Sequence, residues 1–167
     1  MIQEIDSWVS EDERRFLLDY VRTYQDTVTH RNTKILKDIG CSHILAPKIH
    51  ALCGDCYVSC WAKVLKKGED LEPHNHATDD AHIFSGTLFL TGPDIGTSFT
   101  SKTYKNKEGT LMYFPSTVVH WVEPNPSDEI RVSMSFDFLF NRNISPEMNK
   151  FLVEIKAEKG HLFKAAW

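Results

Sequence analysis

Alternating apolar and polar positions dominate the middle of this 167-residue chain and predict a β-rich core. We expect short strands near residues 56–66, 72–76, 83–91, 97–104, 110–114, 118–123 and 129–140. The intervening segments, such as LKKGED and EPNPSDE, are rich in residues that favour turns. Short strands separated by turns are typical of an antiparallel sandwich or barrel. We therefore expect a barrel core over about residues 57–140.

The segment RVSMSFDF gives the clearest strand pattern. Its apolar side chains fall on one face: Val132, Met134, Phe136 and Phe138. Its polar side chains fall on the other: Arg131, Ser133, Ser135 and Asp137. The first face predicts contact with a core, whereas the second is compatible with either a polar cavity or solvent.

Helical patterns flank this β-rich region. Ser10 and Glu13 form a capping-box motif, and the apolar spacing that follows predicts an amphipathic helix over 11–25. Near the other end, Pro146 suits a first helical position, and an apolar stripe predicts a second helix over 146–158. We expect both helices to cover the sheet.

Composition and charge narrow the class of protein. With 41% apolar and 25% charged residues, the chain resembles an ordinary globular protein, which we treat as a single domain over 1–167. A net charge of -4 argues against a nucleic-acid partner or an anionic lipid surface. Without a signal-like or membrane-spanning apolar run, we expect a cytoplasmic protein with no membrane partner. A homodimer is compatible with this sequence, which does not fix the oligomeric state.

The cysteines Cys41, Cys53, Cys56 and Cys60 allow two interpretations. The CGDC segment has the spacing of a redox or zinc site. Cys60, however, falls within a strand pattern, where a cysteine behaves as a small buried hydrophobe. We favour the structural interpretation, with reduced thiols in the cytoplasm.

Histidines supply the main candidate chemistry. His74 and His76 are two residues apart in EPHNHATDD, so on a strand their α-carbons lie about 6.6 Å apart on one face. Imidazoles at this spacing can bind iron, zinc, copper or nickel. A pair of this kind is a weak motif, because exposed or structural histidines show the same spacing.

A third histidine strengthens the metal hypothesis. His120 ends the segment GTLMYFPSTVVH, and a barrel strand can return it to the first pair. Asp79 and Asp80 are candidate carboxylate ligands, which would leave coordination positions open for substrate and oxygen. The residues therefore leave the third ligand open between His76 and one of these carboxylates.

The same segments resemble cupin motifs. GEDLEPHNHATDDAHIFSG is similar to the first cupin motif, with Asp80 in the usual glutamate position. GTLMYFPSTVVH is similar to the second motif. The chain departs from the pattern at Thr117, where cupins usually carry glycine, and in an interval before Gly86 that is one residue short.

A better resemblance is to a family of small 2-oxoglutarate-Fe(II) oxygenases with a double-stranded β-helix, or jelly-roll, fold. It rests on HNHATDDAHIFSGTLFL and YFPSTVVHWVEPNPSDEIRVSMSFDF. The resemblance implies Fe(II) and 2-oxoglutarate as cofactors, and hydroxylation of a C–H bond as the reaction. It also implies that Arg131 and Ser133, the Arg-x-Ser after His120, bind the distal carboxylate of 2-oxoglutarate.

One departure from that superfamily affects the metal ligands. Most members carry His-x-Asp or His-x-Glu where this chain has His74-x-His76. The ligands are then either three histidines or His74 and His120 with Asp79 or Asp80. Strand geometry favours His76, because a carboxylate later in the chain must fold back from a loop.

Two rival functions remain. One is a cupin enzyme without 2-oxoglutarate, such as a cosubstrate-free dioxygenase or an isomerase. The other is a non-catalytic cupin-like module that binds a metal or ligand. For Arg131, the rival interpretation is a structural salt bridge to an acidic residue.

The substrate is not readable from the sequence. We expect a small molecule or a peptide, selected by loops over 26–55 and 92–108. Trp61, Tyr113 and Trp121 are candidate cavity-wall residues.

Overall fold

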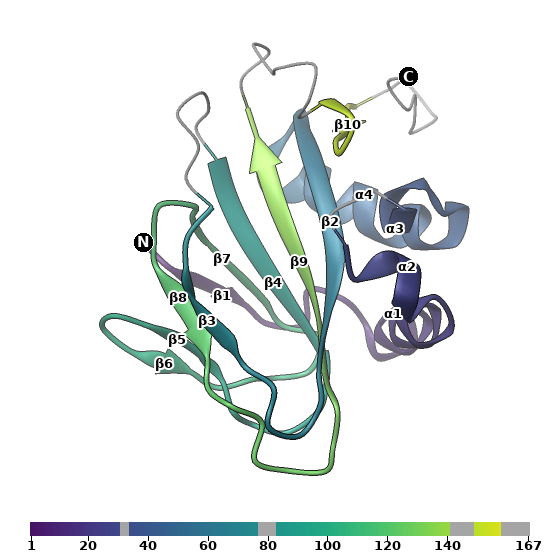
Figure 1. Ribbon diagram of the computed structural model, residues 1–167. Helices are drawn as coiled ribbons and strands as arrows, with labels where there is room; N and C mark the ends of the chain where they lie inside the picture. The colour runs from purple at the N-terminus through teal and green to yellow at the C-terminus, as the bar shows by residue number, and fades with distance from the viewer. Residues whose placement is uncertain (31–33, 77–82, 141–148, 158–167) are drawn as a thin grey trace.

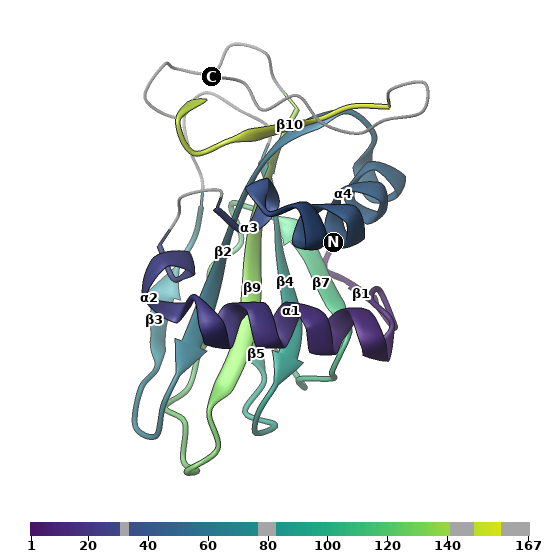
Figure 2. The ribbon, with the colours of Figure 1, turned by 90° about the vertical axis from the view of Figure 1, so that its right-hand side faces the viewer.

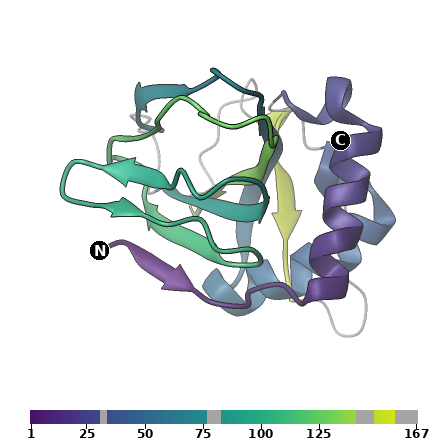
Figure 3. The same ribbon diagram turned by 90° about the horizontal axis from the view of Figure 1, so that it is seen from below.

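The computed structural model describes residues 1–30, 34–76, 83–140 and 149–157. Two antiparallel sheets face each other, and helices cover the outer face of the larger sheet (Figure 1). The view from below shows the same three layers side by side (Figure 3). This arrangement confirms the predicted mainly β architecture with a helical cover at the N-terminal side.

The larger sheet has six strands in the order β1-β7-β4-β9-β2-β10. In that order they are Gln3–Ile5, Leu111–Pro115, Ile83–Thr91, Arg131–Leu139, Cys56–Leu65 and Val153–Ile155. The smaller sheet has the order β3-β8-β5-β6. Its strands are Leu71–His74, His120–Val122, Thr97–Phe99 and Thr103–Tyr104. Most of these strands coincide with the predicted ones, because their alternating patterns are long and end at turn residues.

β9 lies in the middle of the larger sheet, between β4 and β2. Its apolar side chains pack into the main core on the helical side, where Trp8 meets Phe136 edge-on with ring centroids 5.9 Å apart. The opposite side chains face the smaller sheet, as the contacts of Arg131 and Asp137 show. The polar face of RVSMSFDF therefore lines the interior between the sheets, and the solvent alternative is excluded for this strand.

Helix α1 (Glu11–Thr23) lies across the strands of the larger sheet (Figure 2). Its capping box is present as predicted, with Ser10 and Glu13 exchanging hydrogen bonds between side chain and backbone. The buried Arg14 fastens the helix to the sheet by donating to the backbone oxygen of Leu90.

Among the described residues, no helix combines the length and the hydropathy needed to cross a membrane.

The segment 26–55, expected to be a loop, is largely helical. It contains α3 (Lys34–Lys37), α4 (Ile39–Cys53) and most of α2 (Gln25–Val28). Pro47 lies inside α4 and lowers its intrinsic helix propensity. Burial against neighbouring elements overrides that cost, because apolar side chains of α4 belong to the main core.

The C-terminal prediction of a helix over 146–158 is wrong at Val153–Ile155, although Asn149 is helical. Val153–Ile155 is strand β10, which pairs with the start of β2 through Val153 and Val58. The apolar residues fit either periodicity, and the unpaired edge of β2 decides between them by offering backbone hydrogen bonds. Residues 146–148 and 158 lie outside the described residues.

Two smaller differences concern strands. The strand expected over 97–104 is a hairpin of β5 and β6, paired through Thr97 and Tyr104. The short strand β1 had no sequence signal, and it is defined by pairing with β7.

Gly92 directly follows β4 and lies against the backbone at the start of β9. Its φ is +120°, and a Cβ there would lie 2.5 Å from the α-carbon of Arg131. Gly68 also has a positive φ, +78°, but a Cβ there would meet nothing within 4 Å. Substitutions at these two glycines therefore distinguish the cost of backbone strain, present at both, from the cost of a steric clash, present only at Gly92.

We predict that Gly68→Ala costs about 1–2 kcal/mol of unfolding free energy, from backbone strain alone. Gly92→Ala should cost about 1–3 kcal/mol more, because its methyl group must displace the start of β9. Urea unfolding of both variants measures the difference. Equal losses would contradict this account of the junction.

Candidate metal and cosubstrate site

Three histidines converge at the inner face of the smaller sheet. His120 on β8 is paired with His74 on β3 and, on its other side, with Phe99 on β5. His76 follows the end of β3, and its backbone N–H donates to the oxygen of Ser116 at 2.8 Å. One potential ligand atom from each histidine lies within 4.8 Å of the others. The structure thus brings together the three predicted histidines, although His76 lies just beyond the strand.

Hydrogen bonds orient the three imidazole rings. The Nδ1 of His74 lies 2.8 Å from the oxygen of Glu72, and the Nδ1 of His120 lies 3.1 Å from that of Val118. The Nδ1 of His76 lies 2.6 Å from Oδ1 of Asp137. When each oxygen accepts a hydrogen bond from the Nδ1 of a neutral ring, the Nε2 of that ring is free to bind a metal ion.

Burial keeps His120 neutral. Its side chain is 4% exposed, and desolvation lowers its pKa to about 4. Phe114 and Phe99 lie beside its ring, with centroids 4.9 and 5.9 Å away. A neutral imidazole held in apolar surroundings fits a divalent metal ion, because binding requires no loss of a proton from the ring.

Asp137 is a site residue to which the sequence assigned no role. It is fully buried, and its carboxylate accepts from His76 and from the Ser85 hydroxyl, the latter at 2.9 Å. The register places Asp137 beside Ser85 on β4 and Ser59 on β2. In the sequence, the feature that could have indicated Asp137 was its position on the polar face of the RVSMSFDF strand. Its contact with His76, which lies just beyond β3, is set by the tertiary structure.

The carboxylate candidates Asp79 and Asp80 lie outside the described residues. The described part of the site therefore contains three histidines and the carboxylate of Asp137, which contacts His76.

Arg131 lies on the same polar face of β9 as Asp137 and is 1% exposed. Its guanidinium donates to the hydroxyls of Ser133, at 3.0 Å, and Thr97, at 3.3 Å. Asn106 accepts from Nε at 3.0 Å in the amide orientation that satisfies both of its polar atoms. The predicted proximity of Arg131 and Ser133 is confirmed, whereas Thr97 and Asn106 carried no sequence signal.

All of these partners of Arg131 are neutral. Within the described ranges, no carboxylate forms an ion pair with its guanidinium, so the structural salt bridge considered from the sequence is not found there. Burial alone lowers its pKa, to about 10, which leaves it a cation at neutral pH. A buried cation with only neutral partners provides a site for an anion.

The arginine and the histidines are close along β5. Thr97, which accepts from Arg131, is two residues from Phe99, the pairing partner of His120. Arg131 and His120 therefore contact neighbouring positions of the same short strand.

A partly exposed row of side chains lies between these two groups on the larger sheet. Trp61, Ser135 and Thr87 are register neighbours on β2, β9 and β4, and each is half-buried. The Trp61 ring lies 5.7 Å from that of His76, which supports its predicted place in the cavity wall.

The two other aromatic predictions differ from the structure. Tyr113 belongs to the main core on the helical side, where it stacks on Phe84 at 4.9 Å. Trp121 follows His120 in β8 and so points to the opposite face, where it donates to Glu123. Strand alternation therefore places Phe114, rather than Tyr113, beside the histidines.

Residues 96–137 match a family described as "Putative 2OG-Fe(II) oxygenase". The matched segment includes His120, Arg131 and Ser133, and it excludes His74 and His76. No curated protein matches the chain.

Several solved structures have a similar fold. HygX from Streptomyces hygroscopicus, with nickel and 2-oxoglutarate bound, aligns with a TM-score of 0.69 at 8% identity, covering 84% of this chain and 82% of HygX. A prolyl-4-hydroxylase from Pseudomonas putida aligns with a TM-score of 0.62 at 18% identity, covering 84% and 88%. The epimerase SnoN of nogalamycin biosynthesis, in complex with Fe3+ and alpha ketoglutarate, aligns with a TM-score of 0.68 at 12% identity, covering 83% and 78%.

At these identities the structural neighbours establish the fold, which confirms the predicted double-stranded β-helix. The match over 96–137, together with this fold, confirms the resemblance of the chain to the 2-oxoglutarate-Fe(II) oxygenases.

Proposed function

We propose that this protein is an Fe(II)- and 2-oxoglutarate-dependent oxygenase that hydroxylates a small-molecule or peptide substrate. The observation that carries the proposal is a buried arginine with only neutral described partners, facing the same interior as a cluster of three histidines. Neither feature by itself distinguishes this activity from other metal sites. Together they match 2-oxoglutarate: the arginine would bind its distal carboxylate, and a metal ion held by the histidines would bind its other end.

In this proposal, His74, His76 and His120 hold the metal through their Nε2 atoms. Their Nδ1 atoms are already engaged by oxygen acceptors. Three protein ligands leave coordination positions for a cosubstrate and for oxygen, as catalytic rather than structural metal sites do.

Arg131 and Ser133 would hold the distal carboxylate of 2-oxoglutarate. A guanidinium presents two parallel N–H donors to a carboxylate, which a lysine cannot do. The carboxylate would supply the negative charge that the neutral side chains around Arg131 do not. Binding would therefore offset the cost of keeping this cation buried.

When bound, Fe(II) and 2-oxoglutarate supply oxidative decarboxylation to succinate and transfer of an oxygen atom from O2 to a C–H bond. The residues of the chain position these groups and exclude water. Asp137 holds the Nδ1 proton of His76 and fixes that ring, while Phe99 and Phe114 shield His120. Trp61, Ser135 and Thr87 form a partly open surface on which a substrate can lie.

The second candidate is a cupin-type metalloenzyme that does not use 2-oxoglutarate. Three histidine ligands favour it, because most 2-oxoglutarate oxygenases use two histidines and a carboxylate. The neutral surroundings of Arg131 favour the first candidate, since the second gives this buried cation no partner.

Anaerobic titration with Fe(II) and 2-oxoglutarate tests the proposed function. The wild-type protein should develop a visible metal-to-ligand charge-transfer band only when both are present. Arg131→Lys should weaken 2-oxoglutarate binding about 10- to 100-fold, because charged hydrogen bonds are lost, with little change in iron affinity. Arg14→Lys, at a buried arginine on the helical side, is the matched control and should leave both affinities unchanged. If the band never forms, or if Arg131→Lys binds 2-oxoglutarate as tightly as wild type, the second candidate is favoured.

The third metal ligand is tested by comparing His76→Ala with Asp80→Asn. We expect the alanine variant to lose stoichiometric iron and the asparagine variant to retain it, because His76 already lies in the cluster. Iron content by elemental analysis, with circular dichroism as a folding control, gives the result. Retention without His76 and loss without Asp80 would establish a His-carboxylate-His site instead.

Asp137→Asn tests the orienting role of the buried carboxylate. Loss of its charge should weaken Fe(II) binding about 10- to 100-fold, the usual effect of removing a carboxylate behind a histidine ligand. Ser85→Ala removes only a neutral donor to the same carboxylate and should have a smaller effect. Isothermal titration with Fe(II) under anaerobic conditions measures both. Unchanged affinity in a folded Asp137→Asn protein would show that His76 needs no such support.

A further inference from the structure

A second group of reactive side chains lies outside the metal site, at the junction of α4 and β2. Cys53 is the last residue of α4, and Cys56 is the first residue of β2. Gly54, with φ +73°, reverses the chain between them. The two sulfur atoms are 3.5 Å apart, and both thiols are free. The fold has therefore brought together the CGDC cysteines to which the sequence analysis gave a structural role.

We propose that Cys53 and Cys56 form a redox-active dithiol, which a hydroperoxide oxidises to a reversible disulfide. The proposal does not depend on the metal site or on the proposed oxygenase activity.

The geometry favours formation of this disulfide. A disulfide bond is about 2.05 Å long, so each sulfur has to move by less than about 1 Å. The tight turn at Gly54 already holds the two residues together, and nothing lies within 4 Å of the position where its Cβ would be. The turn therefore has free space in which to adjust.

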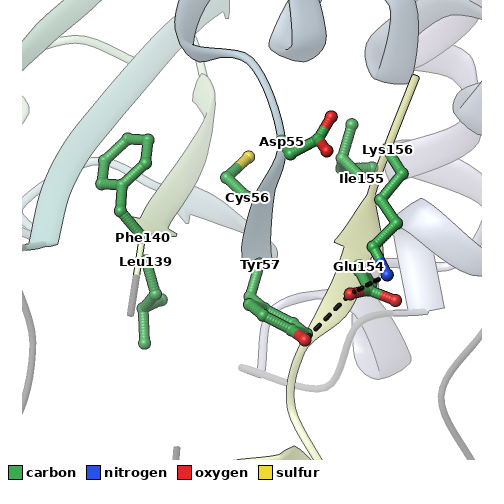
Figure 4. A pocket seen from close by; sticks show the side chains of 8 residues that line it. All are labelled: Asp55, Cys56, Tyr57, Leu139, Phe140, Glu154, Ile155 and Lys156. Carbon is green, nitrogen blue, oxygen red and sulfur yellow. Dashed lines mark hydrogen bonds and ion pairs between the residues drawn. The ribbon is translucent and has the colours of Figure 1, made fainter. Parts of the chain in front are cut away.

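Access differs between the two sulfur atoms. Cys53 is half-buried, whereas Cys56 is buried. Cys56, but not Cys53, belongs to the wall of a pocket of about 200 Å³, and Figure 4 shows it between Asp55 and Tyr57. A small hydroperoxide would therefore reach Cys53 from its own partly exposed side and not through this pocket.

The Cys53 thiol donates to the backbone oxygen of Ile49 at 3.2 Å, which makes Cys56 the donor in the hydrogen bond between the two sulfur atoms. The hydrogen bond from Cys56 lowers the pKa of Cys53, and the same bond, with burial, raises the pKa of Cys56. The negative C-terminal end of α4 opposes a thiolate at Cys53, so this hydrogen bond is the feature that favours it. Cys53 is then the attacking thiolate and Cys56 the resolving thiol.

The reaction proceeds in two steps. The Cys53 thiolate attacks a peroxide oxygen, so an S–O bond forms, the O–O bond breaks, and the leaving alkoxide takes a proton to become an alcohol. Cys56 then attacks the sulfur of the sulfenic acid, so the S–S bond forms and water leaves with the thiol proton. Two electrons pass from the two thiols to the hydroperoxide.

The remaining cysteines serve as internal controls. Cys41 and Cys60 are fully buried, and desolvation raises the pKa of each thiol. Buried thiols of raised pKa are poor nucleophiles. We expect neither to react on the timescale of the Cys53 and Cys56 pair.

The experiment treats the full-length, reduced protein with hydrogen peroxide in the presence of a metal chelator, which suppresses iron-catalysed oxidation. Wild type and the Cys41→Ala/Cys60→Ala control should each lose about 2 Da, and dithiothreitol should restore the mass. Cys53→Ser should show no loss. Cys56→Ser should accumulate a sulfenic acid at Cys53, which dimedone traps.

A second measurement needs no variant. Brief exposure of wild type to peroxide in dimedone, followed by peptide mass spectrometry, should label Cys53 before any other cysteine. Labelling first at Cys41, Cys56 or Cys60, or an intact mass that never falls, would overturn the proposal.

Discussion

Strict alternation along β9 is the constraint on which the rest of this structure depends. All but one of its residues are buried, so its two faces must meet two different environments. The apolar face completes the core beneath the helices, with Phe136 against Trp8. The polar face meets the smaller sheet and can be satisfied only by hydrogen bonds or bound ligands. The candidate site residues of β9, Arg131 and Asp137, lie on that second face.

Two hydrogen-bonded links join the facing sheets across this interior. Asp137 on β9 accepts from His76 beside the smaller sheet, and Arg131 at the other end of the strand donates to Thr97 on β5. One link ends in a carboxylate that is already hydrogen-bonded, and the other in a cation among neutral groups. In the proposed function, the first link supports a metal ligand, and the second belongs to the arginine that would bind the distal carboxylate of 2-oxoglutarate.

The position of the carboxylate also explains how a three-histidine cluster remains compatible with the fold of 2-oxoglutarate enzymes. Asp137 contacts His76 through Nδ1 and leaves the other ring nitrogen free. If His76 binds the metal as proposed, this negative charge lies behind a ligand, where it increases the basicity of the imidazole and fixes its orientation. Of the two proposed redox cysteines, Cys56 begins β2, the strand that also carries Trp61, whereas Cys53 ends α4.

The sequence by itself determined the β-rich core, the first helix and the candidate site residues that the fold brings together. These features depend on local signals: alternation along strands, a capping box, and the Arg-x-Ser after His120. Only the tertiary structure decided the helices within 26–55, the strand at Val153–Ile155 and the roles of Asp137 and Thr97. In α4 the burial of apolar side chains overcomes Pro47, and at β10 an open sheet edge selects a strand from an ambiguous pattern. Asp137 gains its role from a histidine that is 61 residues away in the chain, and sequence periodicity carries no information about such a contact.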